Sequence, residues 1–530
     1  MPDAAIGLAF PPALAGLVVG GWRLEEPGRA PSSAPWPGLC QARAPLAWYD
    51  SLEVRSLGGG AFAGFGGALA GLRGRTPTPQ RQAHSTFSLA NGSGGLDENA
   101  LTLARGDSLR SFGLDVASGK RGAMAGLERA GRHQWGGRAK LTRGHHELAA
   151  SFAQRGEAAQ LADDEEQAGR GQSGSASWRW HRGGTAWTGE YARGLDRHSS
   201  FGGGLLPSER EAQETRLAAG FTRAREGRIL DARLEWADES VRRFDFGAFA
   251  RESRSLWGAV RTRLPLAGGR LELAMGAGRH GGVERFDVAP SATFDVRLRG
   301  LDATLAVERL LTPVWADLAP GFEPFVQRAW MGTMRVVTAR PGALTARASL
   351  RAGRVYSRAL AERLPLEELW LRHGLSSEFG TYDLALGEGG CSWAGRHGDV
   401  GLEGFGLAHH SSGASIGVAR ARRADPDAGF RAWLGGRTRL FGGDLGVALR
   451  GEVAGVGARE RQVEELQILP AFVTYGLVCE LALGDVTIVV SGRNLEDRPR
   501  EQPWTDVSTG LPEVTGRRDV ALNLVWRLFN

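Results

Sequence analysis

Cysteine is almost absent from this chain of 530 residues, which has only Cys40, Cys391 and Cys479. Three scattered cysteines provide neither a disulfide framework nor the paired spacing of a zinc knuckle. No apolar run reaches the ~18 to 20 residues that a membrane-spanning helix needs. The formal net charge is +6, yet the arginines are spread among Asp and Glu without a basic block. A nucleic-acid partner is therefore not expected, because nucleic-acid binding needs clustered basic residues.

Arrangements that carry catalysis or bind metals are also lacking. No Ser/His/Asp set has an interpretable spacing, and the glycine-rich stretches lack the lysine of a phosphate loop. The paired histidines at 145–146 and 409–410 cannot chelate a metal from a strand, because adjacent strand residues point to opposite faces. The acidic stretch at 162–167 is expected to solvate a loop. We therefore expect neither an enzyme nor a metal or cofactor site.

The chain does contain 78 glycines and 16 tryptophans, and apolar and polar residues alternate from about residue 82 onward. In "LDARLEWA", Leu230, Leu234 and Trp236 share one face, and Asp231 and Arg233 share the other. Alternation with period two is typical of β-strands. Tight turn signals near 182, 225, 266 and 483 roughly alternate with long polar segments at 155–172, 194–212, 238–252 and 495–516. This pattern predicts about 22 strands joined as hairpins.

Two settings produce such strands. A soluble sandwich or propeller turns the apolar face into a core, and a transmembrane β-barrel turns it to lipid and the charged face to a wet lumen. Segments of about 9 to 11 residues suit a membrane crossing, and no repeat of propeller length is visible. Aromatic residues near the expected strand ends suit an interfacial girdle: Trp135, Trp178, Trp187, Tyr191, Trp236, Trp257 and Trp330. The sequence therefore favours an all-β antiparallel transmembrane barrel.

The C-terminal region resembles that of TonB-dependent outer-membrane receptors. It reads "LPAFVTYGLVCELALGDVTIVVSGRNLEDRPR" from residue 469, then a loop, then "GRRDVALNLVWRLFN". The matching positions are Asn494, Leu495, Asp497, Arg498, Gly516 and Arg517. The resemblance implies that the last strand closes the barrel against the first. It also implies that this strand is read by the barrel assembly machinery, through Leu524, Trp526 and Leu528.

Two N-terminal stretches are similar to the second half of that family's plug domain, "LVVGGWRLEEPG" at 17–28 and "YDSLEVRSLGGGAFAGFGGALAG" at 49–71. Gly20, Ser56 and Ala63 depart from the family pattern, and neither the first half of a plug nor a TonB box is seen in the sequence. We therefore expect a partial plug-like domain over 1–80 in the lumen of a barrel over 81–530. The resemblance also implies a TonB-type energising protein as a partner.

The resemblance implies a monomeric receptor in the outer membrane of a Gram-negative-type bacterium, surrounded by lipid, that imports a siderophore- or vitamin-like solute. It places ligand contacts at Arg29 and Trp36 and at the loops around 155–172 and 194–212. Lumen-facing arginines either hold the plug and line a pathway or pair with acids on neighbouring strands: Arg179, Arg233, Arg297, Arg347, Arg351 and Arg493. Two alternatives remain open, a passive or structural barrel without TonB coupling and a soluble all-β binding protein.

Overall fold

The fold is taken from a computed structural model of the chain. The structure describes residues 22–25, 51–55, 61, 70–75, 83–92, 96–107, 109–121, 127–161, 166–201, 208–243, 249–266, 268–283, 285–314, 325–338, 344–358, 379–410, 427–462, 466–497, 500–505, 512–515 and 518–528. Among these residues, no helix is both long and apolar enough to cross a membrane.

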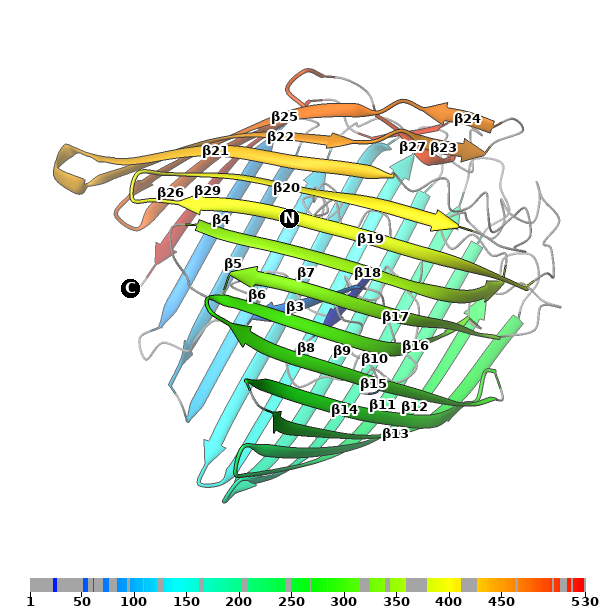
Figure 1. Cartoon of the computed structure of the whole chain (residues 1–530). Coiled ribbons are helices and arrows are strands. Elements are labelled where there is room, and N and C mark those ends of the chain that lie inside the picture. Colours follow the sequence, from blue (N-terminus) through cyan, green and yellow to red (C-terminus); the bar gives the residue numbers. More distant parts are fainter. Residues whose placement is uncertain are drawn as a thin grey trace.

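Most of the described residues form one closed antiparallel barrel of 22 strands (Figure 1), as the sequence predicts. In chain order the barrel strands are β4 (His84–Gly92), β5 (Leu96–Gly106), β6 (Arg110–Arg121), β7 (Leu127–Arg143), β8 (His146–Leu161), β9 (Glu166–Arg182), β10 (Thr185–Phe201), β11 (Ser208–Arg225), β12 (Arg228–Arg243), β13 (Phe249–Leu266), β14 (Gly269–His280), β15 (Arg285–Leu298), β16 (Leu301–Val314), β17 (Phe325–Thr338), β18 (Leu344–Arg358), β19 (Phe379–Ala394), β20 (Gly398–His410), β21 (Ala428–Leu440), β22 (Leu445–Val456), β25 (Phe472–Leu483), β26 (Val486–Arg493) and β29 (Asp519–Leu528).

The last strand closes the barrel. On one side β29 pairs with β26, and on the other it pairs with β4, where Leu524 lies opposite Leu89 and Trp526 opposite Phe87. Each barrel strand thereby gains two hydrogen-bonded neighbours, so the barrel that the structure describes exposes no long sheet edge.

The tight turns lie at one end of the barrel, on the left in Figure 1, where the C-terminus also lies. We call this the short-turn end and the opposite one the loop end. Several of these turns hold glycine at positive φ, including Gly183 (55°), Gly227 (77°), Gly268 (74°) and Gly484 (55°), at the sites where the sequence predicts them. Glycine is favoured there because it lacks the Cβ that makes this region costly.

The long polar segments were predicted as loops, and this was wrong for most of their length. Segment 155–172 is strand up to Leu161 and again from Glu166, and segment 194–212 is strand up to Phe201 and from Ser208. The strands reach 18 residues, longer than a crossing requires. Toward the loop end they carry polar side chains on both faces, so the apolar alternation ends before the strand pairing does.

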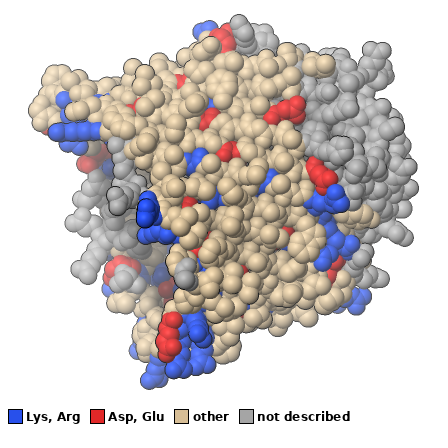
Figure 2. Space-filling model, in the orientation of Figure 1, with Lys and Arg blue, Asp and Glu red and all other residues tan. Residues whose placement is uncertain are grey.

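The two faces of the wall differ in composition and exposure. On the outer face, large apolar side chains are exposed around the whole barrel: Leu101, Leu114, Leu148, Trp178, Trp187, Leu217, Leu234, Val260, Leu273, Leu305, Met334, Leu350, Leu402, Leu434, Leu477 and Trp526. Figure 2 shows a mostly uncharged surface across this wall, with Lys and Arg mainly toward its edges. The lumenal face carries the alternating polar residues and most of the buried side chains.

Trp257 corrects one prediction. It was placed in the aromatic girdle, but it is only 4% exposed and lies on the lumenal face. On β13, Leu256 and Val260 occupy the outer face at 50% and 51% exposure. An odd-numbered residue between them must point inward.

Three small sheets accompany the barrel. β1 (Trp22–Glu25), β3 (Ala70–Arg75) and β2 (Ser51–Arg55) form a sheet in that order within the region expected to be plug-like. At the loop end, β23 (Arg459–Gln462) pairs with β24 (Leu466–Leu469), and β27 (Arg500–Thr505) pairs with β28 (Pro512–Thr515). A short 3-10 helix, η5 (Phe441–Gly443), forms the turn between β21 and β22.

Candidate functional site

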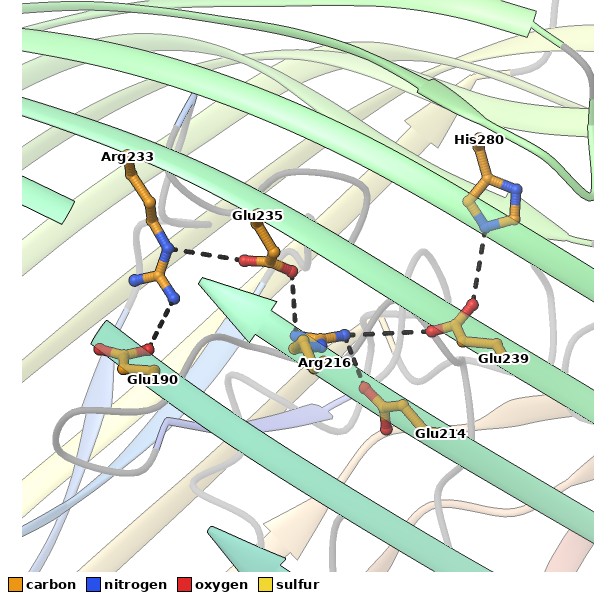
Figure 3. A network of polar contacts seen from close by, with 7 residues as sticks. All are labelled: Glu190, Glu214, Arg216, Arg233, Glu235, Glu239 and His280. Atoms are coloured by element: carbon orange, nitrogen blue, oxygen red, sulfur yellow. Dashed lines mark hydrogen bonds and ion pairs between the residues drawn. The ribbon is translucent and has the colours of Figure 1, made fainter. Parts of the chain in front are cut away.

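A network of charged residues covers the lumenal face of β10 to β14 (Figure 3). We call it the first ionic network; its members are Glu190, Glu214, Arg216, Arg233, Glu235, Glu239 and His280. Arg233 on β12 donates to Glu190 on β10 over 2.9 Å, across the intervening strand β11. It can do so because β11 presents the small residues Ala218 and Gly220 opposite these two positions.

Arg216 is the centre of this network. Its guanidinium lies 2.8 Å from Glu214, 3.3 Å from Glu235 and 4.0 Å from Glu239. The side chains of Arg216 and Glu239 are only 4% and 2% exposed. A buried guanidinium is tolerated where carboxylates surround it, because desolvation of the charge is then offset by close ion pairs.

His280 extends the network to the end of β14. Its Nε2 lies 3.8 Å from a carboxylate oxygen of Glu239, and its Nδ1 lies 3.4 Å from the hydroxyl of Ser253. The ring is fully buried at 0% exposure. Within these seven residues, four carboxylates face two guanidiniums and one imidazole, so the network has a negative surplus when the imidazole is neutral.

Next to this network, the lumenal wall contacts the N-terminal region of the chain. The indole Nε1 of Trp257 donates a hydrogen bond of 2.9 Å to the backbone oxygen of Ala61. Ala61 is 0% exposed and Trp257 is 4% exposed. A buried indole N–H normally has such a partner, so this contact fixes residue 61 against β13 at a single point.

The wall around Trp257 is shaped for this approach. A Cβ added to Gly276 would lie 2.6 Å from the Ala61 oxygen and would also strike the Trp257 ring. Glycine at this position therefore allows the two backbones to come close. Trp257 also belongs to a buried apolar cluster with Ala259, Ala289, Leu311 and Val326.

A second ionic network lies on the lumenal face of β18 to β22 and consists of Arg347, Glu403, Arg431 and Glu452. Arg347 contacts Glu403 across β19, where Gly390 lies opposite both residues. Arg431 binds Glu452 through two hydrogen bonds of 2.8 and 2.6 Å. Trp433 packs nearby, with the guanidinium of Arg450 4.9 Å from its ring centroid, a cation–π distance.

The remaining lumen arginines of the sequence prediction do not join either network. Arg297 stands at the end of β15 and pairs with Asp302 across the turn to β16 at 2.9 Å. Arg179 is exposed, in register with Glu147, and Arg493 is exposed opposite Asp519 at the end of β26. Arg351 is buried at 4% exposure opposite Thr333. The structure thus brings Arg233 and Arg347 into separate networks and leaves the others at separate places on the wall.

Several predicted site residues lie outside the described residues, namely Arg29, Trp36 and the side chain of Leu528. Among the paired histidines, His145 lies in a turn and His146 begins β8, where its ring accepts a hydrogen bond of 3.2 Å from Trp178. No group of three potential metal ligands occurs among the residues that the structure describes.

Several network members were not among the residues predicted from the sequence, nor was the inward orientation of Trp257. They are Glu190, Glu214, Arg216, Glu239 and His280 of the first ionic network and Glu403, Arg431 and Glu452 of the second. Alternation places Glu190 and Arg216 on the same lumenal face as Arg233. Because Leu256 and Val260 point outward, Trp257 cannot lie on the outer face of β13. The faces of these residues were therefore predictable from the sequence. The hydrogen-bond partner of Trp257 was not predictable, because Ala61 lies 196 residues away in the chain.

The fold and the site define a class. A closed barrel with an apolar outer face and a charged lumen is typical of membrane-spanning β-barrels. The chain matches no family model and no curated protein by sequence.

Solved structures do resemble it. The FrpB iron transporter from Neisseria meningitidis (F3-3 variant) has a TM-score of 0.76 at 10% identity, over 97% of this chain and 92% of that one. The ferric yersiniabactin uptake receptor FyuA from Yersinia pestis has a TM-score of 0.76 at 12% identity, over 96% and 89%. The copper transporter OprC has a TM-score of 0.74 at 12% identity, over 96% and 90%. At these identities the likeness establishes a shared fold.

Proposed function

We propose that the protein is an outer-membrane receptor of the TonB-dependent type that imports a scarce solute, such as a metal chelate or a vitamin-like compound. A solute binds at the loop end, and its passage requires displacement of the N-terminal region from the lumen. The contact between Trp257 and Ala61 carries this proposal and supports it, because the backbone oxygen of residue 61 accepts a hydrogen bond from the lumenal wall of a 22-stranded barrel. The uptake functions printed for the iron transporter and the ferric yersiniabactin receptor support it.

The partners belong to the same proposal. The apolar outer face is matched to lipid of the outer membrane. A TonB-type protein would supply energy, and the strand pairing of Leu524 and Trp526 fits a terminal strand read by the assembly machinery. We propose that one chain forms the functional unit, because a closed barrel has no edge that needs a second copy.

Growth of a deletion strain tests the import. We expect slower growth when iron or a vitamin is limiting, rescue by the wild-type chain, and no difference when the nutrient is abundant. Loss of rescue on inactivating the energising partner would establish the coupling. Normal growth of the deletion strain, combined with a high steady conductance of the purified protein in planar bilayers, would instead indicate a passive barrel. Recovery in the soluble fraction would refute both.

A further inference from the structure

The outer face of β9 to β12 carries a row of charged residues toward the loop end. We call it the outer arginine row; its members are Arg170, Arg197, Glu211 and Arg242. The strand register places Arg170 directly opposite Arg197, Arg197 opposite Glu211, and Glu211 opposite Arg242. Four neighbouring strands thus present three guanidiniums and one carboxylate in one continuous row across the strands.

Like charges directly opposite each other on a sheet are destabilising, and this row is only partly neutralised. Arg197 donates to Glu211 over 2.6 Å, and its side chain remains 57% exposed. The other carboxylate oxygen of Glu211 accepts a hydrogen bond from Gln213, at 2.7 Å. Arg170 is exposed and has no ion-pair partner among the residues that the structure describes. The lumenal face differs, since each arginine of the first ionic network lies against two or more carboxylates.

The row lies on the loop-end side of the apolar band of the outer face. On β9 the exposed Trp178 lies on the same face nearer the short-turn end, and on β10 Trp187 and Tyr191 do so. Arg193, two residues after Tyr191, is exposed on that face between the aromatic band and Arg197. Trp187 lies close to the tight turn, so it belongs to the interface at the short-turn end, where aromatic residues concentrate. Arg197 lies ten residues further along β10, about the length of one tilted membrane crossing, which brings the row to the level of lipid headgroups at the loop end.

We propose that the outer arginine row is a binding site for the phosphate groups of a membrane lipid headgroup in the outer leaflet. Arginine suits this ligand, because its planar guanidinium forms paired hydrogen bonds to phosphate oxygens. A bound phosphate would also relieve the repulsion between Arg170 and Arg197. The lipid is favoured over free phosphate because the site adjoins the apolar wall, where acyl chains of the same molecule can pack. This inference rests on the membrane location given under the proposed function.

The test uses the purified full-length chain in nanodiscs of neutral phospholipid. The probe is a bisphosphorylated glycolipid of the lipid A type, its dephosphorylated form is the matched probe, and bound lipid is counted by native mass spectrometry. The variant is Arg170→Gln with Arg197→Gln. The matched control is Arg254→Gln, because Arg254 is 75% exposed on the same face and is paired with Asp238 at 3.4 Å.

We expect the double variant to bind the phosphorylated probe about tenfold more weakly, which corresponds to roughly 1.4 kcal/mol. Arg254→Gln should bind as the wild type does, and the dephosphorylated probe should show no preference among the three proteins. Equal binding by wild type and double variant would overturn the proposal. If inorganic phosphate displaces the phosphorylated probe when both are present at the same concentration, the site binds the free ion and the lipid proposal is overturned.

Gel electrophoresis distinguishes a folding defect from a binding defect, because a folded barrel migrates differently before and after heating. If the double variant does not show this change in migration, the charge-preserving variant Arg170→Lys with Arg197→Lys is used in its place. This variant must retain most of the binding of the phosphorylated probe, and loss of that binding would also overturn the proposal. The assay measures lipid and not import, so a chain that binds the probe but does not support growth refutes only the proposed function. A chain that does not enter nanodiscs refutes both.

Discussion

The two ionic networks of the lumenal wall use the same pairs of residue types but differ in burial. In the first, Arg216 and Glu239 are 4% and 2% exposed, and the adjoining wall contacts Ala61. In the second, Arg347 is 57% exposed and Arg431 is 28% exposed. Ion pairs in water contribute little, whereas breaking a buried pair leaves an uncompensated charge. The β10–β14 sector is thus the side of the lumen with the more deeply buried ion pairs, and Ala61 contacts the wall beside it.

The largest effect is expected from Arg216→Met. Removal of this guanidinium leaves the carboxylates of Glu214 and Glu239 buried without their shared counter-charge. We expect a loss of about 3 to 5 kcal/mol in the free energy of unfolding, measured by urea titration of tryptophan fluorescence in detergent micelles. Arg223→Met is the control, because Arg223 lies exposed on the outer face of the same strand. Similar losses in both variants would contradict the comparison.

Gly276→Val should break the contact with the N-terminal region and leave the barrel closed. The added side chain collides with the Ala61 oxygen and the Trp257 ring, and overpacking of this kind costs about 1 to 3 kcal/mol. We expect a higher ion conductance in planar bilayers, because residue 61 can no longer rest on the wall. Trp257→Phe, which removes only the indole N–H, should raise the conductance by less.

The control for this experiment is Gly258→Val on β13, where an added Cβ comes no closer than 3.9 Å to another atom. It should leave the conductance unchanged. An unchanged conductance in Gly276→Val, with the barrel folded, would show that the contact at Ala61 does not restrict the lumen.

Arg431→Gln in the second network should have a smaller effect than Arg216→Met. It removes two hydrogen bonds to Glu452 and a longer contact of 3.7 Å to Glu403. Both carboxylates remain partly solvated, so we expect a loss of about 1 kcal/mol in the same urea titration. Arg439→Gln is the control on the same strand, since Arg439 is exposed. A loss as large as that of Arg216→Met would mean that burial does not separate the networks.

The sequence predicts the barrel well because alternation is a local signal. Strand number, tight turns and the closing strand all follow from it, together with the resemblance of the C-terminal motif. In that motif Asn494 and Asp497 adopt positive φ values of 48° and 58°, and Asp497 accepts a hydrogen bond of 2.7 Å from the backbone of Arg518. These residues therefore hold the start of β29 near the end of β26, a role that the pattern alone does not reveal.

The site is harder to predict because its contacts cross strands. Glu190 and Arg233 are 43 residues apart, and Arg347 and Glu403 are 56 apart, each pair spanning an intervening strand. Such pairing depends on small residues such as Gly220 and Gly390 on the strand between. Alternation gives the face of an arginine but neither its partner nor its burial.

The smallest effect is expected from Arg297→Gln, which removes an ion pair more exposed than those of either network. Arg297 and Asp302 are 71% and 50% exposed at the turn between β15 and β16, so water and salt screen their attraction. We expect the urea midpoint to be unchanged at physiological salt and slightly lower than that of the wild type only at low salt. The backbone turn, with Arg299 and Gly300 at positive φ of 32° and 97°, holds the hairpin without the pair. In 1 M salt the screening length is only about 3 Å. A loss of stability that persists there would show that the pair of Arg297 and Asp302 helps to hold the turn.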